Sequence, residues 1–279
     1  MIKVRLFPRK TNATPIDENV IINRYPNLFD KADKIDISVT FTYDMKRAEE
    51  LYNQWKYVAP TEIGGPALDI PEGEFIPGKF IKQGYVITSR GCPNRCWFCR
   101  VWKRQPEIKE LDIKEGWNLL DDNILACSDS HITAVFGMLK RQKKKARFTG
   151  GLEAKRLKEW HCELLADLRP EYLYFAYDTP DDYEYLLNAG KMLKDFGFGK
   201  SHNMMCYVLI GYKNDTIELA LERIKKVIVA GFMPFAMRYR DKNGLYLTER
   251  KWNIFQREWT RPEIVASNCK RILVDKSSN

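Results

Sequence analysis

The 279-residue chain is poor in histidine and has no long apolar run. Its three histidines are His131, His161 and His202, which excludes a site built from imidazoles in the first 130 residues. No stretch approaches the roughly 20 consecutive apolar residues that a membrane-spanning helix needs. Repeats and low-complexity segments are absent as well. The sequence therefore predicts a globular protein of the cytoplasm that does not interact with membranes.

Paired cysteine spacing is also absent outside one short segment. The seven cysteines are an odd number, and four of them lie far apart, at Cys127, Cys162, Cys206 and Cys269. This distribution argues against a disulfide framework and is typical of a reducing compartment. The remaining three cysteines crowd into eight positions.

Acidic residues are fewer than basic ones, 37 against 46, so the formal net charge is +9. Such a charge suits a nucleic acid, an acidic redox protein or an anionic small substrate as partner. The densest basic run, KRQKKKAR at 140–147, follows a helical pattern and precedes a strand, so we interpret it as a solvated helix end. A second basic group surrounds the three clustered cysteines and consists of Arg90, Arg95, Arg100, Lys103 and Arg104.

From about residue 84, short apolar runs alternate with amphipathic windows of helical period. This alternation predicts six strand–helix units and a parallel α/β sheet, wound as a partial (β/α)6 TIM-type barrel or an open curved sheet. Ligands of such folds bind at the carboxyl ends of the strands. The expected strands lie at or near 84–89, 119–127, 147–151, 171–177, 203–211 and 233–239.

Different patterns flank this repeating region. Residues 1–80 predict a small N-terminal α/β extension with a strand–helix–strand unit at 34–68, followed by a linker at 70–80. Residues 81–240 would form the barrel, and 241–279 a C-terminal helical cap. Trp252, Phe255 and Trp259 have helical spacing, which favours a capping helix packed on the barrel. Alternatively, these aromatic residues stack on nucleotides.

The segment TSRGCPNRCWFCRVW at 88–102 holds Cys92, Cys96 and Cys99 and follows the first expected strand. Closely spaced thiols in a reducing compartment indicate zinc or an iron–sulfur cluster. Both usually take four protein ligands, and the next cysteine or histidine is Cys127. A zinc site would need such a distant fourth ligand, whereas three thiolates on a four-iron cluster leave one iron open to an exchangeable ligand.

This CPNRCWFC segment resembles the cysteine motif of the radical S-adenosylmethionine (radical SAM) superfamily, in which an aromatic residue precedes the last cysteine. Weaker similarities follow over about 83–240. LLDDNILAC resembles the second strand of the family and the polar residues after it, FTGGLEAKRL the third, FAYDTPDD the fourth and YVLIGYKNDT the glycine-bearing fifth.

The resemblance implies a [4Fe-4S] cluster on Cys92, Cys96 and Cys99 and a SAM molecule chelating the fourth iron. Electron transfer from the reduced cluster would cleave SAM and give a 5'-deoxyadenosyl radical, which abstracts hydrogen from a substrate. The resemblance assigns no catalytic side chain. By position, it implies these cofactor contacts: Phe98 at the adenine, Asp122 and Asn123 at the amino group, Glu153 and Asp178 at the ribose or carboxylate, Gly211 at the adenine, and Arg238 at the carboxylate. The alternatives are a helix cap for each acidic residue and an ordinary core position for Phe98.

The resemblance also implies a flavodoxin or ferredoxin as electron donor, which the basic residues around the cysteines would attract. The substrate is unidentified, and the charge favours an anion, a nucleotide or a nucleic acid. The N-terminal extension resembles a shortened flavodoxin-like domain of cobalamin-dependent members, but a histidine-ligated cobalamin is excluded there because no histidine precedes His131. The alternative function is an iron–sulfur or zinc-containing protein that binds nucleic acid or acts as a sensor without radical chemistry.

Overall fold

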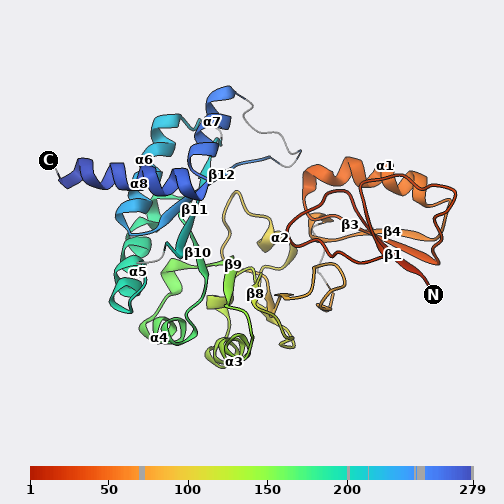
Figure 1. Cartoon of the computed structure of the whole chain (residues 1–279), viewed down its shortest axis with the longest axis horizontal. Helices are drawn as coiled ribbons and strands as arrows, with labels where there is room; N and C mark the ends of the chain where they lie inside the picture. Colours follow the sequence, from red (N-terminus) through yellow and green to blue (C-terminus); the bar gives the residue numbers. More distant parts are fainter. Residues whose placement is uncertain (69–72, 200–201, 213, 242, 244–248, 278–279) are drawn as a thin grey trace.

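The computed structural model describes residues 1–68, 73–199, 202–212, 214–241, 243 and 249–277 (Figure 1). Its main sheet has six strands, and every neighbouring pair is parallel. The strand order β5-β8-β9-β10-β11-β12 follows the chain, so each strand lies beside its predecessor. The expected α/β fold with a six-strand parallel sheet is confirmed. The strands are β5 Tyr85–Val86, β8 Asn118–Leu119, β9 Arg147–Leu152, β10 Tyr172–Ala176, β11 Met204–Ile210 and β12 Met233–Arg238.

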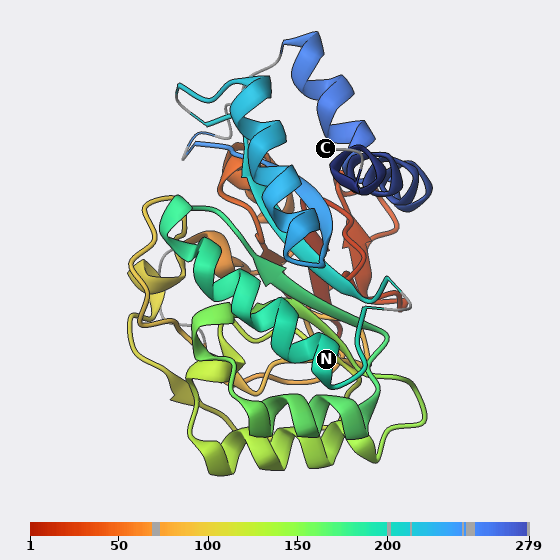
Figure 2. The same ribbon diagram turned by 90° about the vertical axis from the view of Figure 1, so that its left-hand side faces the viewer.

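Four helices connect the strands after β8 and cover one face of the sheet (Figure 2). Neighbouring helices contact each other in chain order. Side-chain caps fix two of the starts: the Ser128 hydroxyl accepts the His131 N–H at 3.2 Å, and the Thr216 hydroxyl accepts the Leu219 N–H at 3.2 Å. The basic run 140–147 connects α3 to β9, as expected. The helices are α3 Asp129–Lys140, α4 Glu159–Leu168, α5 Tyr183–Asp195 and α6 Ile217–Val229.

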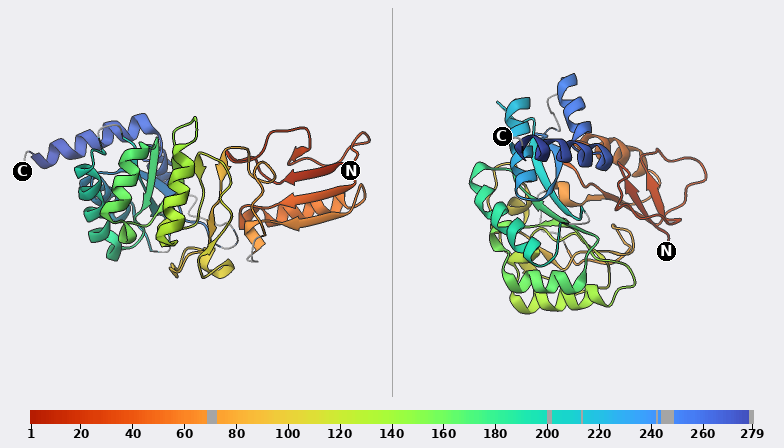
Figure 3. Two further views of the ribbon diagram at one scale, coloured as in Figure 1. Left: turned by 90° about the horizontal axis from the view of Figure 1, so that it is seen from below. Right: turned by 60° about the vertical axis from the view of Figure 1, so that its left-hand side comes forward.

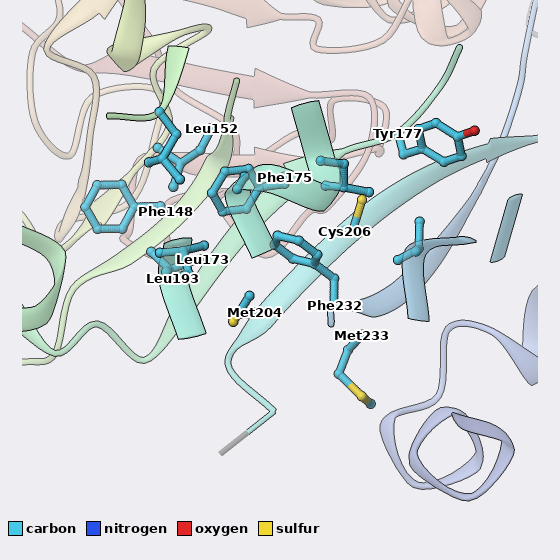
Figure 4. Packing of buried hydrophobic residues seen from close by; sticks show 14 of the residues in the cluster. Phe148, Leu152, Leu173, Phe175, Tyr177, Leu193, Met204, Cys206, Phe232 and Met233 are labelled. Carbon is cyan, nitrogen blue, oxygen red and sulfur yellow. The ribbon is translucent and has the colours of Figure 1, made fainter. Parts of the chain in front are cut away.

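The core lies between this sheet and its helices (Figure 4). Strand β11 alternates buried and half-buried residues, so Met204, Cys206, Val208 and Ile210 point inward. Phe175 of the neighbouring strand β10 is fully buried and meets Phe232 at a ring-centroid distance of 5.1 Å. Burial of this apolar face is the main term that stabilises the arrangement.

The N-terminal extension has its own sheet and its own core (Figure 3). Helix α1, Met45–Trp55, packs Leu51 and Trp55 against this four-stranded sheet, and both side chains are fully buried. Strands β3 and β4 and helix α1 were expected, whereas β1 and β2 were not. Part of the expected linker, residues 70–72, lies outside the described residues. The parallel strands, in the order β2-β1-β3-β4, are β1 Lys3–Phe7, β2 Val20–Ile22, β3 Lys34–Ser38 and β4 Thr61–Gly64.

The described C-terminal segment forms two helices, α7 Arg250–Glu258 and α8 Pro262–Ser277, where one capping helix was expected. Proline at the first position of α8 explains the break, because its ring is accommodated at a helix start but not in a helix interior. Trp252, Phe255 and Trp259 are only 1%, 5% and 3% exposed. Their packing role is therefore confirmed, and the alternative that they stack on nucleotides is wrong.

Three short elements surround the cysteine segment: β6 Ser89–Arg90, α2 Val101–Arg104 and β7 Lys109–Glu110. The remaining short elements are 3-10 turns, of which η3 Ile124–Ala126 follows β8 and η4 Ala154–Arg156 follows β9. Within the described ranges, none of the helices combines the length and the apolar character needed to cross a membrane.

Candidate functional site

The cysteine loop, residues 91–108, leaves the main sheet just after β5. Strands β6 and β7 pair antiparallel at its two ends, with Ser89 opposite Glu110 and Arg90 opposite Lys109. Inside the loop, the Cys92 N–H donates to the Gln105 carbonyl at 3.2 Å. The loop is therefore closed at its base, and the segment with the three cysteines projects from the carboxyl end of the first strand.

Gly91 is needed at the point where the chain turns into this loop. Its φ is +93°, a region that residues with a Cβ rarely adopt. A Cβ placed there would lie 2.1 Å from the Glu107 carbonyl oxygen on the returning part of the loop. Both conditions require glycine, so the close approach of the two ends of the loop depends on this residue.

Three consecutive residues after β8 hold the start of the cysteine loop. Asp121 accepts the Thr88 N–H and the Thr88 hydroxyl, both at 2.6 Å, and the Ser89 hydroxyl at 2.7 Å. Asp122 accepts the Gly91 N–H at 2.9 Å. Asn123 donates to the Cys92 sulfur at 3.5 Å. The end of the second strand of the main sheet thus fixes the path of the chain leading into Cys92.

The three clustered thiols influence one another electrostatically. Burial, together with the nearby Cys99 and Cys92, raises the pKa of Cys96 to about 11. The Cys99 sulfur also accepts the Val101 N–H at 3.5 Å. All seven cysteines are free thiols. Among the described residues, no three or more Cys, His, Asp or Glu side chains are gathered closely enough to hold a metal ion, and this includes a set completed by Cys127.

Asn123 connects the cysteine loop to the end of β9. Its amide nitrogen donates to Glu153 Oε2 at 2.6 Å, and the same carboxylate oxygen accepts Arg156 Nε at 2.8 Å. Asn123 is 4% exposed, and its Oδ1 has no hydrogen-bond donor within the described part of the chain. A buried acceptor without a donor is costly, so this atom fits an incoming N–H group beside Cys92.

Asp178 follows β10 and is bound to the next strand. Its Oδ1 accepts the Leu209 N–H at 2.9 Å. Burial raises the pKa of Asp178 to about 6, while the Leu209 N–H lowers it. The Asp178 charge in turn contributes to the raised pKa of Cys96.

Gly211 follows β11 with a φ of +71°, and its N–H donates to Asp215 Oδ2 at 2.7 Å. A Cβ on Gly211 would lie 3.6 Å from the Trp252 ring of α7. Asp215 also forms an ion pair with Arg223 of α6 at 2.7 Å. Glycine here is explained by its backbone conformation.

The last two expected contacts are Phe98 in the cysteine loop and Arg238 at the end of β12. Arg238 ends β12 and donates to Asn253 Oδ1 of α7 at 2.5 Å. Phe98 is half-buried and meets Trp97 edge to face at 5.3 Å. Trp97, 56% exposed, was not among the expected site residues, yet its ring lies 5.6 Å from Tyr212 and 5.3 Å from Tyr239. An aromatic group therefore spans the cysteine loop and the ends of β11 and β12.

Arg104 joins the cysteine loop to the N-terminal extension. Its Nη1 donates to the Pro66 carbonyl after β4 at 3.0 Å, and its Nη2 lies 3.6 Å from Asp122. Helix α2 and the loop region consequently lie between the two sheets (Figure 3). Of the basic residues around the cysteines, only Arg95 and Lys103 are exposed, and the others are half-buried.

His131, which the sequence also places after the second strand, lies in the core. It is 8% exposed, with Nε2 at 3.4 Å from the Thr88 hydroxyl and Nδ1 at 3.7 Å from Glu110 Oε2. These contacts support the structural role that is commonest for a lone histidine.

The seven expected cofactor contacts share one location, because all lie in the cysteine loop or at the carboxyl ends of the strands. Among the described residues, hydrogen bonds bring together Cys92, Asn123 and Glu153. A search against models of known protein families finds none that matches the chain, and a search of curated proteins likewise finds no relative.

Proposed function

We propose that the chain is a radical SAM enzyme with a partial (β/α)6 barrel, in which Cys92, Cys96 and Cys99 bind a [4Fe-4S] cluster that also binds SAM. The observation that carries the proposal is the attachment of the cysteine loop. Asp121, Asp122 and Asn123, at the end of the second strand, bind four groups in the three residues 88, 89 and 91, and also the Cys92 sulfur.

The chemistry of the donor set supports this proposal. Three free thiols in one loop are too few for a closed structural site. They do not converge on a single ion among the described residues, but each thiolate of a four-iron cluster would bind a different iron, and the fourth iron would keep a position that can exchange ligands. When bound, the cluster and SAM would supply reductive cleavage of the sulfonium and hydrogen abstraction from a substrate. The protein supplies position, and the hydrogen bonds around Asp121 keep the loop base rigid before any ligand binds.

The polar residues after the next strands would orient SAM. Asn123 Oδ1, buried and lacking a donor among the described residues, would accept an N–H of its amino group. Glu153 is held by Asn123 and Arg156 and so has a fixed orientation beside Cys92. Phe98, Asp178, Gly211 and Arg238 would complete the contacts from the other strand ends, and Asp122 would act mainly by holding Gly91.

A flavodoxin or ferredoxin of the cytoplasm would deliver the electron. Exposed Arg95 and Lys103 on the cysteine loop would attract such an acidic donor, and raising the salt concentration would slow the electron transfer. The role proposed for these two residues is donor docking, because among the described residues neither is hydrogen-bonded or ion-paired to the other candidate site residues.

Anaerobic reconstitution with iron and sulfide, followed by metal analysis, tests the site. We expect about four irons per chain, the number in a four-iron cluster. Cys92→Ala, Cys96→Ala and Cys99→Ala should each prevent stable cluster assembly. Cys269→Ala is the matched control, because this thiol is equally free but lies 7% exposed in α8.

The variant Cys127→Ala distinguishes a zinc site from the proposed iron–sulfur cluster. If the loop bound zinc with Cys127 as a distant fourth ligand, this variant would lose metal together with the three loop variants. In the proposed enzyme it keeps its iron. Zinc in place of iron, or an intact cluster that binds no SAM, would contradict the proposal and favour the nucleic-acid-binding or sensor protein.

A further inference from the structure

A pocket among the described residues borders the candidate site and shares Glu153 with it, while most of its lining has no role in the proposal above. It has a volume of about 390 Å³, within the range typical of small-molecule sites. One wall comes from the cysteine loop and from η3 after β8, and the other from η4 and the start of α4. The lining residues are Asn94, Leu125, Ala126, Cys127, Asp129, Glu153, Lys155, Arg156, Lys158 and His161.

His161 lines this pocket and carries a buried hydrogen-bond donor that has no acceptor among the described residues. The backbone N–H of Lys158 donates to its Nδ1 at 3.1 Å, so in the neutral ring the proton is on Nε2. Burial lowers the pKa of His161 to about 4, and the ring is neutral near pH 7. His161 is 2% exposed, and its Nε2 has no partner within the described ranges. A buried N–H of this kind fits an oxygen atom of a ligand.

Positive charge converges on the same place. Arg156 pairs with Glu153 at 2.8 Å, while Lys155 and Lys158 line the pocket together with Asp129. The Lys155 ammonium also lies 5.3 Å from the centre of the Tyr185 ring. Neither lysine has a carboxylate within ion-pair distance among the described residues. The pocket also lies at the start of α4, a helix of 10 residues whose first turn carries backbone N–H groups without helical acceptors.

We infer that this pocket binds a phosphate group of the substrate through Lys155, Lys158 and the Nε2–H of His161. Two ammonium groups, a neutral N–H donor and a helix N-terminus match the three or more acceptor oxygens and the double charge of a phosphate monoester better than a carboxylate. The pocket is large enough to hold part of a sugar or base as well. The substrate class is therefore a phosphorylated small molecule or nucleotide, an assignment that rests on the proposed function only in naming the ligand a substrate.

Calorimetric titration of the full-length chain with inorganic phosphate tests the inference. We expect saturable binding that Lys155→Met/Lys158→Met weakens about tenfold or more, which corresponds to the loss of at least one charge-assisted contact. Lys191→Met is the control, because Lys191 is an exposed lysine of α5 outside the pocket, and it should leave binding unchanged. Succinate as titrant should bind more weakly than phosphate.

An NMR spectrum of the histidine ring nitrogens tests the inference without any substitution in the pocket. The chain has three histidines, so the His161 signals can be identified. Phosphate should shift the Nε2–H signal of His161 and leave that of His202 in place. An unchanged His161 signal, equal loss of binding in Lys191→Met, or tighter binding of succinate would overturn the inference.

Three further outcomes test this inference separately from the proposed function. Displacement of phosphate by S-adenosylhomocysteine would overturn the inference, because the pocket would then belong to SAM. Phosphate binding in a chain that assembles no cluster would support the phosphate pocket and contradict the radical SAM proposal. SAM cleavage without phosphate binding would support the radical SAM proposal and contradict the phosphate pocket.

Discussion

Asp121 accepts two hydrogen bonds from Thr88, one from its backbone N–H and one from its hydroxyl, each at 2.6 Å. The two residues are 33 positions apart and lie at the ends of the first two strands of the main sheet. Asp121 is 1% exposed, and burial raises its pKa. This contact fixes the point at which the cysteine loop leaves the sheet, so stability and the candidate site depend on the same side chain.

Replacement of Asp121 by alanine should lower the free energy of unfolding by about 3 kcal/mol, because three buried donors of Thr88 and Ser89 lose their acceptor. Urea denaturation measures the change. Asp195→Ala, at an exposed position near the end of α5, is the control and should change stability little. Equal destabilisation by the two variants would show that the contact has no special role.

Gly91→Ala should disrupt the closure of the cysteine loop. The added Cβ meets the Glu107 carbonyl at 2.1 Å, and φ is +93°, so we expect a loss of about 2–4 kcal/mol. Gly197→Ala is the matched control: its φ is +87°, but nothing lies within 4 Å of the added Cβ. It should cost only the backbone term, about 1 kcal/mol. Iron content after reconstitution should fall in Gly91→Ala alone.

Asn123→Ala should weaken SAM binding about tenfold and leave cluster assembly intact, because it removes the buried Oδ1 acceptor and not a thiol. Equilibrium binding of SAM to the reconstituted protein measures this effect. Asn203→Ala, before β11, is the control variant and should bind SAM as the native chain does. A loss of iron in Asn123→Ala would mean that the residue acts on the cluster loop alone.

His161 should make stability depend on pH. Its folded-state pKa is lowered from 6.5 to about 4 by burial, so between these values the unfolded chain binds a proton that the folded chain does not. The stabilisation is complete above pH 6.5 and is lost as the pH falls toward 4, by about 1–2 kcal/mol. Urea denaturation at pH 7 and 4.5 should show this loss in the native chain and in His202→Gln, but less of it in His161→Asn. The same loss in all three proteins would contradict this assignment.

The six-strand sheet could be predicted because each strand carries its own apolar run, as in β11, where buried and half-buried residues alternate. Strands β1 and β2 were both missed, although β1 buries Val4, Leu6 and Phe7. Strand β2 offers a much weaker signal. β2 has three residues, none of them buried, and it is a strand only because it pairs with β1. The division of the C-terminal cap into two helices follows from Pro262, whose position after Trp259 could have predicted a break.

Within the candidate site, the sequence predicts which residues lie at the strand ends but not what each contacts. Asp121 was missed because its partners lie 32 and 33 residues away and only the fold brings them together. Trp97 was missed because the cysteine motif includes only Phe98, the aromatic residue directly before the last cysteine. The phosphate pocket escaped prediction because the unpaired nitrogen of His161 depends on a contact with the Lys158 backbone.

Production of 5'-deoxyadenosine is the measurement that tests the central claim most directly. The reconstituted chain would be incubated anaerobically with SAM and dithionite, and the nucleoside quantified by chromatography. The account predicts 5'-deoxyadenosine from the native chain and from Cys269→Ala, and none above background from Cys92→Ala, Cys96→Ala or Cys99→Ala. A chain that assembles its cluster and yet forms no 5'-deoxyadenosine, or a loop variant that forms as much as the native chain, would contradict it.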